Sequence, residues 1–276
     1  MTTGRFAPSP TGPLHFGSLV AAVGSWLFAR REGGRWLVRM EDLDTPRVVP
    51  GSADEILRAL ERYALTWDGE VVYQSQRRTF YEAALNELRA KNRVFDCACS
   101  RADLQRAASA PVGEEAVYPG TCREGIEPGR VPRAVRFRGN GEVDDFVVKR
   151  ADGVYAYQLA VVVDDAAQGV TQVVRGADLL MSMPRQIALQ QALGYPTPQY
   201  IHLPLVLGPD GKKLGKRDGA LPLPSLDERR VMETLRDALR FLGLEVELAP
   251  PAEMLRQSVS SSRAPAGVHA DRGTRG

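Results

Sequence analysis

Residues 5–18, with the sequence RFAPSPTGPLHFGS, constrain the fold more than any other stretch of this chain. Residues 5–7 can end a β-strand, the prolines and Gly12 exclude regular structure, and an apolar run begins at Leu19. The pattern predicts a strand, a stiff loop and then a helix. Such a junction presents backbone N–H groups and a positive helix end at the carboxyl edge of a parallel sheet, where anionic ligands bind. The loop has neither the P-loop pattern GxxxxGK[ST] nor the dinucleotide pattern GxGxxG.

Length and charge set only wide limits on the rest of the molecule. At 276 residues the chain can hold one large α/β domain or two small ones, and its net charge of +2 neither requires nor excludes a nucleic-acid partner. No segment approaches the roughly 20 apolar residues of a membrane span, and the N-terminus lacks a signal-peptide pattern. We therefore expect a soluble cytoplasmic protein without a membrane partner.

The first half of the chain predicts a β-α-β unit with carboxylates at its edge. A helix over 19–31 ends at Gly33 and Gly34, and a strand follows over 35–40. Glu41 comes directly after that strand, so it faces the same crevice as the first loop. We interpret Glu41 as functional, whereas Asp42 and Asp44 fit loop and cap roles equally well.

Further elements follow from periodicity. We expect amphipathic helices over 53–63, with Ser52 as its cap, and over 78–90. The second half predicts strands over 146–150, 154–157, 170–175 and 200–207, and helices over 159–163, 183–193 and 229–242. Beyond Pro250 the Ser-, Gly- and Arg-rich composition predicts disorder.

Segment 94–135 has a different character, with cysteines, glycines and prolines in place of helical periodicity. It contains all the cysteines of the chain in the pattern CxC-x18-Y-x3-C, formed by Cys97, Cys99, Tyr118 and Cys122. Three thiolates suit a tetrahedral zinc site better than a disulfide framework. Spacing alone leaves the fourth ligand open between Tyr118, Asp96, Asp103 and water, and it also allows no metal at all.

A lysine-rich loop, GPDGKKLGKRDG, follows the last predicted strand. Two glycine turns flank the lysines, which predicts a mobile cationic loop. A solvated basic turn is the commonest fate of such a run.

Three passages together resemble the class I aminoacyl-tRNA synthetases of the glutamyl type. The run PLHFGS resembles their HIGH signature within a longer matching stretch, and VVRGADLL at 173–180 is a second similar passage. KLGKR at 213–217 resembles the KMSKS signature, although Gly215 and Arg217 stand where serines are usual. The resemblance spans residues 4–242 and makes other HxGH-type nucleotidyltransferases an unfavoured alternative.

The resemblance implies an α/β fold. This fold is a class I synthetase Rossmann-like parallel sheet with an inserted zinc-binding region and a short helical C-terminal part. The implied divisions are 1–93 and 136–217 for the two halves of the catalytic domain, 94–135 for the insertion, 218–250 for the helical part and 251–276 for a disordered tail.

The resemblance also implies a site. Glutamate would be bound by Arg5, Phe6, Ala7, Pro8, Ser9, Glu41, Tyr157 and Arg175. ATP with Mg²⁺ would be bound by His15, Gly17, Ser18, Lys213 and Lys216, with His15 and Lys216 as the catalytic residues. One structural zinc would be held by Cys97, Cys99, Tyr118 and Cys122.

Within the family, the metal pattern and the short segment after the lysine loop resemble the truncated glutamyl-queuosine tRNA(Asp) synthetases. These monomeric enzymes activate glutamate with ATP and transfer it to queuosine at the wobble position of tRNA(Asp), not to the 3′ end. Two alternatives remain. One is a tRNA(Glu)-charging synthetase or a fragment of one, and the other is a catalytically silent tRNA- or zinc-binding relative.

Overall fold

Strands from distant parts of the chain lie side by side in the computed structural model. It describes all residues except 101, 105–117, 209–222, 224–225, 264 and 271–276. The chain forms two compact units, each assembled from separate segments. The first unit comprises 1–75, 169–180 and 198–276, and the second comprises 76–168 and 181–197.

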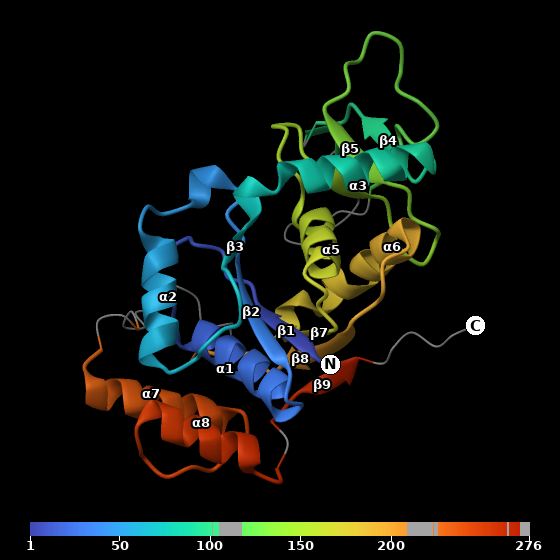
Figure 1. The fold of residues 1–276 in the computed structure, drawn as a ribbon. Coiled ribbons are helices and arrows are strands. Elements are labelled where there is room, and N and C mark those ends of the chain that lie inside the picture. The colour runs from blue at the N-terminus through green and yellow to red at the C-terminus, as the bar shows by residue number, and fades with distance from the viewer. Residues whose placement is uncertain (101, 105–117, 209–222, 224–225, 264, 271–276) are drawn as a thin grey trace. The chain divides into compact units, whose positions relative to one another are not determined.

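The first unit is built on strands that are mostly parallel (Figure 1). Strands β1 (Thr3–Phe6), β2 (Arg35–Met40) and β3 (Val72–Tyr73) form one parallel set. Strands β7 (Gln172–Gly176) and β8 (Gln199–Leu203) are parallel, and β9 (Val268–Ala270) adds to β8 in antiparallel direction. The backbone N–H of Thr171 donates to the Thr3 carbonyl at 2.9 Å, which joins the sets along β1 and β7.

Helix α1 (Phe16–Arg31) is the centre of the first unit's core. Its middle is apolar on every side, as expected for a helix enclosed by other elements, and Leu19 and Leu27 are fully buried. A Cβ on Gly24 would lie 2.5 Å from the Leu203 side chain, so only glycine allows this close approach of helix and strand. Helices α2 (Ser52–Arg62), α7 (Glu228–Phe241) and α8 (Pro251–Ser260) complete this core.

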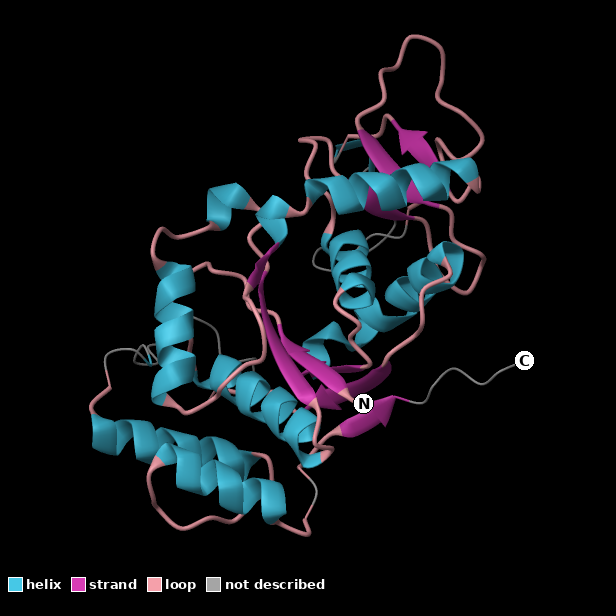
Figure 2. Cartoon of the chain, in the orientation of Figure 1, coloured by secondary structure: helices cyan, strands magenta, loops and turns pink. Residues whose placement is uncertain are grey.

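The second unit combines helices with an antiparallel sheet (Figure 2). The sheet contains β4 (Val94–Cys97), β5 (Ala134–Phe137) and β6 (Phe146–Lys149), and the helices are α3 (Arg78–Ala90), α5 (Tyr157–Ala167) and α6 (Met183–Leu193). Asp164 of α5 is fully buried, where it accepts hydrogen bonds from Arg77 Nε at 2.5 Å and from the Tyr81 hydroxyl at 2.8 Å. These contacts offset the cost of burying its charge and connect α3 with α5.

Within the described part of the chain, short 3₁₀ helices lie in the connections at η1 (Thr45–Arg47), η2 (Gln74–Gln76) and η3 (Ala177–Ser182). The described residues include no helix that is both long enough and apolar enough to span a membrane.

Local predictions fail where a tertiary contact competes with the sequence signal. Ser52 does not cap α2, because Gly51, with φ of +78°, is the N-cap residue. The Ser52 hydroxyl instead donates to the Gly12 carbonyl at 2.9 Å. The strand expected over 154–157 is only an isolated bridge at Tyr155, and Tyr157 already begins α5. Strand β8 ends at Leu203, because Pro204 supplies no backbone N–H.

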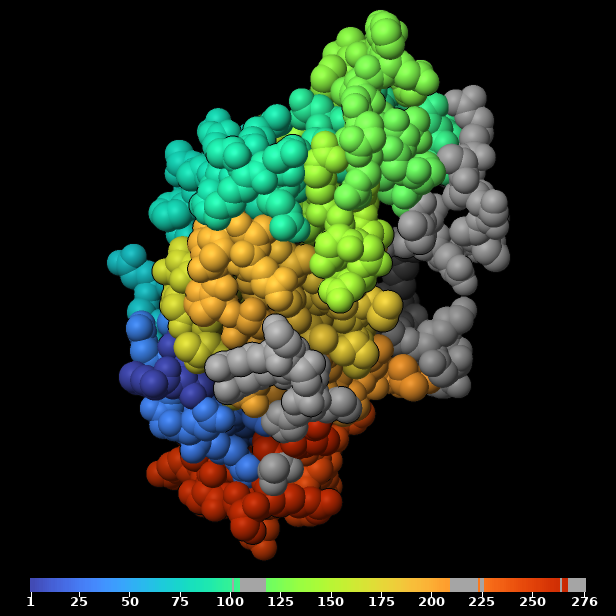
Figure 3. Space-filling view, turned by 90° about the vertical axis from the view of Figure 1, so that its right-hand side faces the viewer, coloured from blue at the N-terminus to red at the C-terminus, as the bar shows by residue number. Residues whose placement is uncertain are grey.

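The disorder predicted beyond residue 250 is wrong for two segments. Helix α8 buries Met254 and Leu255 in the main core, and β9 pairs with β8. Arg31 of α1 fixes the end of α8 by donating to the carbonyls of Ser258 at 2.7 Å and Ser261 at 2.9 Å. Figure 3 shows this C-terminal part, in red, packed against the blue N-terminal part. Composition suggested a solvated tail, but the apolar spacing within α8 outweighs it.

Candidate functional site

The proline-rich loop after β1 is tied to the segment that follows β2. The backbone N–H of Glu41 donates to the Pro8 carbonyl at 2.9 Å, and that of Val49 donates to the Pro10 carbonyl at 2.9 Å. Gly12 has φ of +125° and is bonded through both its N–H and its carbonyl to Ser52. These bonds hold the loop in one conformation and so fix the direction from which the chain enters α1.

His15 is the N-cap of α1. Its Nδ1 accepts a hydrogen bond from the Ser18 backbone N–H at 3.3 Å, so the neutral ring carries its proton on Nε2, where it can act as a donor. A Cβ on Gly17 would lie 3.2 Å and 3.3 Å from two ring atoms of His15. Gly17 therefore leaves space for the His15 ring, and the space it was expected to leave for a base stays a prediction.

Strand register places the two predicted arginines on one face of the first unit's sheet. A Cβ on Gly4 would lie 3.1 Å from Ala29 of α1, so the next residue, Arg5, points to the opposite face. Leu203 contacts α1 and belongs with Val174 to the same core, so Arg175 also faces away from α1. Both arginines are buried, with exposed fractions of 4% and 5%.

Glu41 lies beside another buried arginine that the sequence reasoning missed. Its Oε1 is 3.6 Å from Nη2 of Arg39, and its side chain is 11% exposed. The signal for Arg39 was a charged residue within the strand RWLVRM, which is otherwise apolar after its exposed first residue. Asp42 and Asp44 take loop roles, because Asp42 accepts from the Ser75 N–H at 2.8 Å and Asp44 pairs with Arg47 at 2.6 Å.

Arg175 is held by neighbours that include His202, Leu179 and Tyr200. Its Nε donates to His202 Nε2 at 3.3 Å, its Nη2 donates to the Leu179 carbonyl at 3.1 Å, and its guanidinium lies 5.1 Å from the centre of the Tyr200 ring. Burial, followed by the positive charge of Arg175, lowers the pKa of His202 to about 4, although Asp178 acts in the opposite direction. The imidazole is therefore neutral near pH 7.

This lowered pKa predicts a pH dependence of stability. In the unfolded chain His202 takes up a proton below pH ~6.5, whereas the folded protein resists protonation until about pH 4. Stability thus falls as the pH drops through this window. We expect wild type to lose about 2 kcal/mol relative to His202→Gln between pH 7.5 and pH 5, measured by urea unfolding. Parallel curves for the two proteins would contradict the assigned cause.

The predicted metal ligands lie together in the second unit. The Sγ atoms of Cys97, Cys99 and Cys122 are all within 4.8 Å of one another, and those of Cys99 and Cys122 are 3.6 Å apart. The Tyr118 hydroxyl lies 3.5 Å from Cys97 Sγ and 3.9 Å from Cys99 Sγ. A tetrahedral zinc separates its sulfur ligands by about 3.8 Å and sulfur from oxygen by about 3.5 Å. The cluster has the dimensions of such a site.

Arg136 supplies positive charge to this cluster. Its Nε donates to Cys97 Sγ at 3.4 Å, and its guanidinium lies 3.9 Å from the centre of the Tyr118 ring. Burial raises the pKa of Cys97, but its hydrogen bonds with Tyr118 and Arg136 outweigh burial, and the net shift of the pKa is downward. Burial and the neighbouring Cys122 raise the pKa of Cys99 to about 11, and burial also raises that of Tyr118. A bound cation would favour the deprotonated forms instead.

The alternative fourth ligands are engaged elsewhere. Asp96 pairs with Arg89 at 3.0 Å, and Asp103 pairs with Arg130 at 2.7 Å and accepts from the Ser100 N–H at 2.8 Å. The Tyr118 hydroxyl accepts from the Cys122 N–H at 2.8 Å, which orients it within the cluster. Among the three side chains considered, the geometry favours Tyr118.

Some predicted residues lie outside the described part of the first unit. Tyr157 belongs to the second unit, and Lys213 and Lys216 lie outside the described residues. The Phe6 ring is buried and stacks on Trp36 at 6.2 Å, so only its backbone is available to a ligand. Ser9 is exposed, and Ala7 and Pro8 are partly exposed in the loop.

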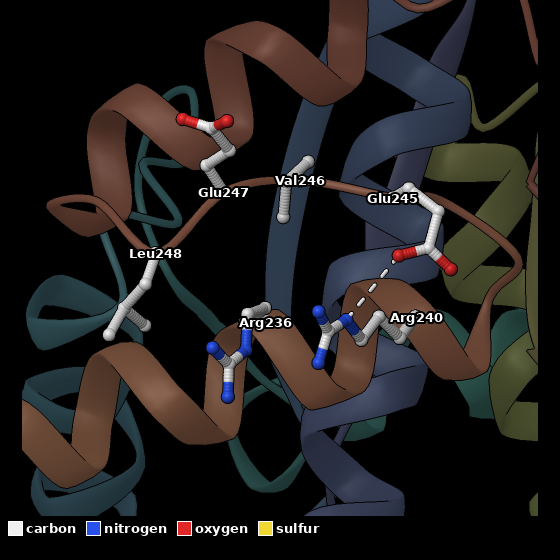
Figure 4. A pocket seen from close by; sticks show the side chains of 6 residues that line it. All are labelled: Arg236, Arg240, Glu245, Val246, Glu247 and Leu248. Atoms are coloured by element: carbon white, nitrogen blue, oxygen red, sulfur yellow. Dashed lines mark ion pairs between the residues drawn. The ribbon is translucent and has the colours of Figure 1, made fainter.

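Two surface hollows are lined by none of the predicted glutamate and ATP residues. One, of about 420 Å³, lies between α7 and residues 245–248, where Arg240 pairs with Glu245 at 3.4 Å (Figure 4). The other, of about 620 Å³, borders the cysteine cluster at Tyr118 and is lined by the ion pairs of Arg123 with Asp145 and Arg185 with Asp144. Both hollows contain paired charges of opposite sign.

Comparison with known proteins gives one consistent result. The family described as "tRNA synthetases class I (E and Q), catalytic domain" matches residues 1–127 and 130–255. A protein of Geobacter sulfurreducens named glutamyl-Q tRNA(Asp) synthetase is 57% identical, over 91% of this chain and 86% of its own length. A protein of Thiobacillus denitrificans with the same name is 54% identical, over 91% of this chain and 90% of its own length.

Solved structures agree with the fold. The glutamate-tRNA synthetase of Elizabethkingia anophelis is 31% identical with a TM-score of 0.67, over 79% of this chain. This chain spans only 53% of that synthetase's length. The putative arginyl-tRNA synthetase of Campylobacter jejuni, at 15% identity and a TM-score of 0.55, is similar in fold alone.

Proposed function

Since the chain belongs to the glutamyl-Q tRNA(Asp) synthetase family of class I synthetases, and is a ligase of the aminoacyl-tRNA synthetase type, we propose a two-step reaction for it. It activates L-glutamate with ATP and transfers the glutamyl group to queuosine in the anticodon loop of tRNA(Asp). The observation that carries this proposal is the 57% identity to a relative so named, over nine-tenths of the chain.

Recognition of glutamate follows from charge. The substrate has two carboxylates and one ammonium group, which two arginines and one carboxylate complement. Arg5 and Arg175 share a sheet face, and Glu41 follows the strand next to β1. An arginine fork binds a carboxylate through two parallel hydrogen bonds, and burial strengthens such pairs. Tyr157, in the second unit, is proposed as a further glutamate ligand from the resemblance alone.

Activation joins the glutamate α-carboxylate to the α-phosphorus of ATP. A carboxylate oxygen attacks phosphorus, the bond to the bridging oxygen breaks, and pyrophosphate leaves with Mg²⁺. Negative charge grows on the α-phosphate, where the Nε2–H of His15 and the N-terminus of α1 would stabilise it. Gly17 and Ser18 open the same helix turn, and Lys213 and Lys216 would act on the phosphates.

Transfer then requires a hydroxyl acceptor. A hydroxyl of the queuosine cyclopentenediol attacks the acyl carbon of the adenylate, the mixed anhydride bond breaks, and AMP leaves. The acceptor proton passes to solvent or to the leaving phosphate, so no covalent bond to the enzyme is needed. Zinc held by Cys97, Cys99, Tyr118 and Cys122 would stabilise the insertion and takes no part in either step.

The proposal is tested by the transfer of labelled glutamate to two tRNA pools that differ only in queuosine. Label confined to the queuosine-containing pool is the expected result. Equal label in both pools would mean 3′-end charging, the second candidate, which the similarity to a glutamate-tRNA synthetase keeps in view. No label in either pool would point to a silent relative.

Lys216→Ala tests the role of the lysine loop. Because Lys216 is proposed to contact phosphate, we expect adenylate formation to slow by about 100-fold, with glutamate affinity changed by less than about twofold. Glutamate-dependent ATP–pyrophosphate exchange measures the rate of adenylate formation. Isothermal titration calorimetry measures the affinity for glutamate. A large loss of glutamate affinity with a normal exchange rate would refute the assigned role.

A further inference from the structure

We propose that His202 is a positioning residue for substrate recognition. It holds the Arg175 guanidinium in the orientation that binds a carboxylate of glutamate. The inference rests on the proposed function, because it takes Arg175 as a glutamate ligand. His202 has no place in the sequence motifs and enters only through its contacts on β8.

The strand register sets this contact. Arg175 and His202 are direct partners in the parallel pairing of β7 with β8, so their side chains emerge next to each other on the same sheet face. His202 is 1% exposed, and its Nε2 accepts the Nε–H of Arg175 at 3.3 Å. Tyr200, two residues earlier on the same face, lies under the guanidinium at 5.1 Å. A slip of one residue would remove both contacts.

The hydrogen bond to His202 uses Nε of Arg175, the guanidinium nitrogen that is attached to the side-chain methylenes. With Nε bonded to His202 and Nη2 bonded to the Leu179 carbonyl, rotation about the last side-chain torsion is blocked. A guanidinium fixed in plane loses less entropy on meeting a planar carboxylate than a mobile one does. A neutral imidazole provides this restraint without adding a negative charge next to Arg175.

Keeping a histidine at this position carries a cost, which the bond to Arg175 explains. Accepting from Arg175 at Nε2 requires that the neutral ring carry its proton on Nδ1. That buried Nδ1 has no hydrogen-bond partner among the described residues. An apolar residue would avoid this unsatisfied donor but would remove the acceptor of the buried Arg175 Nε–H, so the bond to Arg175 is what explains a histidine here. The charged groups that act on the ring are Arg175 and Asp178.

Two variants separate the acceptor from the shape of the ring. His202→Leu removes the acceptor, whereas His202→Gln places an amide oxygen near the position of Nε2. In ATP–pyrophosphate exchange with the full chain, we expect His202→Leu to raise the KM for glutamate about tenfold or more, with kcat and the KM for ATP changed less than about twofold. His202→Gln should restore the KM to within about threefold of wild type.

Arg175→Lys and Ile201→Val serve as the reference variants. Ile201 is buried on the opposite face of the same strand, so its truncation should lower Tm without changing the KM for glutamate. Arg175→Lys should raise the KM for glutamate strongly. Adding His202→Leu to this variant should raise the KM little further, because both substitutions act on the same guanidinium group.

The outcomes distinguish the inference from the proposed function. A raised KM in Arg175→Lys with an unchanged KM in His202→Leu would overturn the inference and leave the function intact. If His202→Leu and His202→Gln lowered Tm equally and raised the KM for glutamate equally, His202 would be only a packing residue. An unchanged KM in Arg175→Lys would remove Arg175 from the pocket and the inference with it. Wild type without glutamate-dependent exchange would refute the function itself.

Discussion

Glu41→Gln is expected to raise the KM for glutamate by about 100-fold or more in ATP–pyrophosphate exchange, with a smaller effect on kcat. The substrate ammonium group gives up water when it enters the pocket, and a charged acceptor compensates for this loss far better than a neutral amide does. Removing one partner of a buried charge pair costs about 2–5 kcal/mol, which corresponds to a factor of about 30 to several thousand in KM, and the expected change falls within this range.

The presence of Arg39 means that the experiment must separate a structural role of Glu41 from a role in binding glutamate. Glu41 lies 3.6 Å from the buried Arg39, so its charge could serve the fold alone. In that case Glu41→Gln would lower Tm and leave the KM for glutamate unchanged, which would contradict the assigned role. Glu70→Gln is the matched control, because Glu70 is exposed and should affect neither quantity. Thermal unfolding measured alongside the kinetics separates the two roles.

The order of elements around the first loop could be predicted because local signals agree there. Prolines 8, 10 and 13 exclude a helix before His15, and the apolar run that follows admits a buried one. Strand β2 has the predicted bounds, and α6 begins and ends as predicted, with Gly194 at φ of +69° as its C-cap. In each of these places a residue with a special backbone preference marks the boundary.

Predictions failed where the deciding partner lies far away in the sequence. Serine is a common N-cap residue, but the hydroxyl of Ser52 donates to the carbonyl of Gly12, forty residues earlier. The sequence of helix α8 alone does not predict a stable helix. Its end is bonded to Arg31, and Leu255 packs into the main core. Short helices gain most of their stability from tertiary packing, which composition does not report.

The site divides in the same way. Glu41 and Arg175 could be proposed as ligands because each stands at the carboxyl end of a predicted strand, where ligands of open α/β sheets bind, whereas Arg5 was proposed from the resemblance to the glutamyl-type synthetases. Arg39 and His202 could not, because their roles depend on which strand face they share with those residues. That information lies in the register between strands, not in any motif.

Cys97→Ser is expected to abolish binding of about one metal ion per chain and to unfold the segment around the cluster. Cys97 is fully buried at the end of β4, and its sulfur meets both the Tyr118 hydroxyl at 3.5 Å and Arg136 Nε at 3.4 Å. Serine shortens the reach and is a poor zinc ligand. Elemental analysis of the purified protein measures the metal, and hydrogen exchange over residues 94–137 measures the order of the segment.

The comparison variants decide what the metal does. Thr121→Ser alters an exposed neighbour of Cys122 and should retain the metal. Tyr118→Phe keeps the ring under Arg136 but removes the oxygen, so it should weaken metal affinity by about 10- to 100-fold if tyrosine is the fourth ligand. Unchanged affinity would assign that position to water.

A metal-free Cys97→Ser protein with full transfer activity and normal exchange protection would show that this segment folds without the ion. Loss of transfer to tRNA with intact glutamate activation would instead confine the metal's role to placing the acceptor, because the residues proposed to bind glutamate and ATP lie outside segment 94–135.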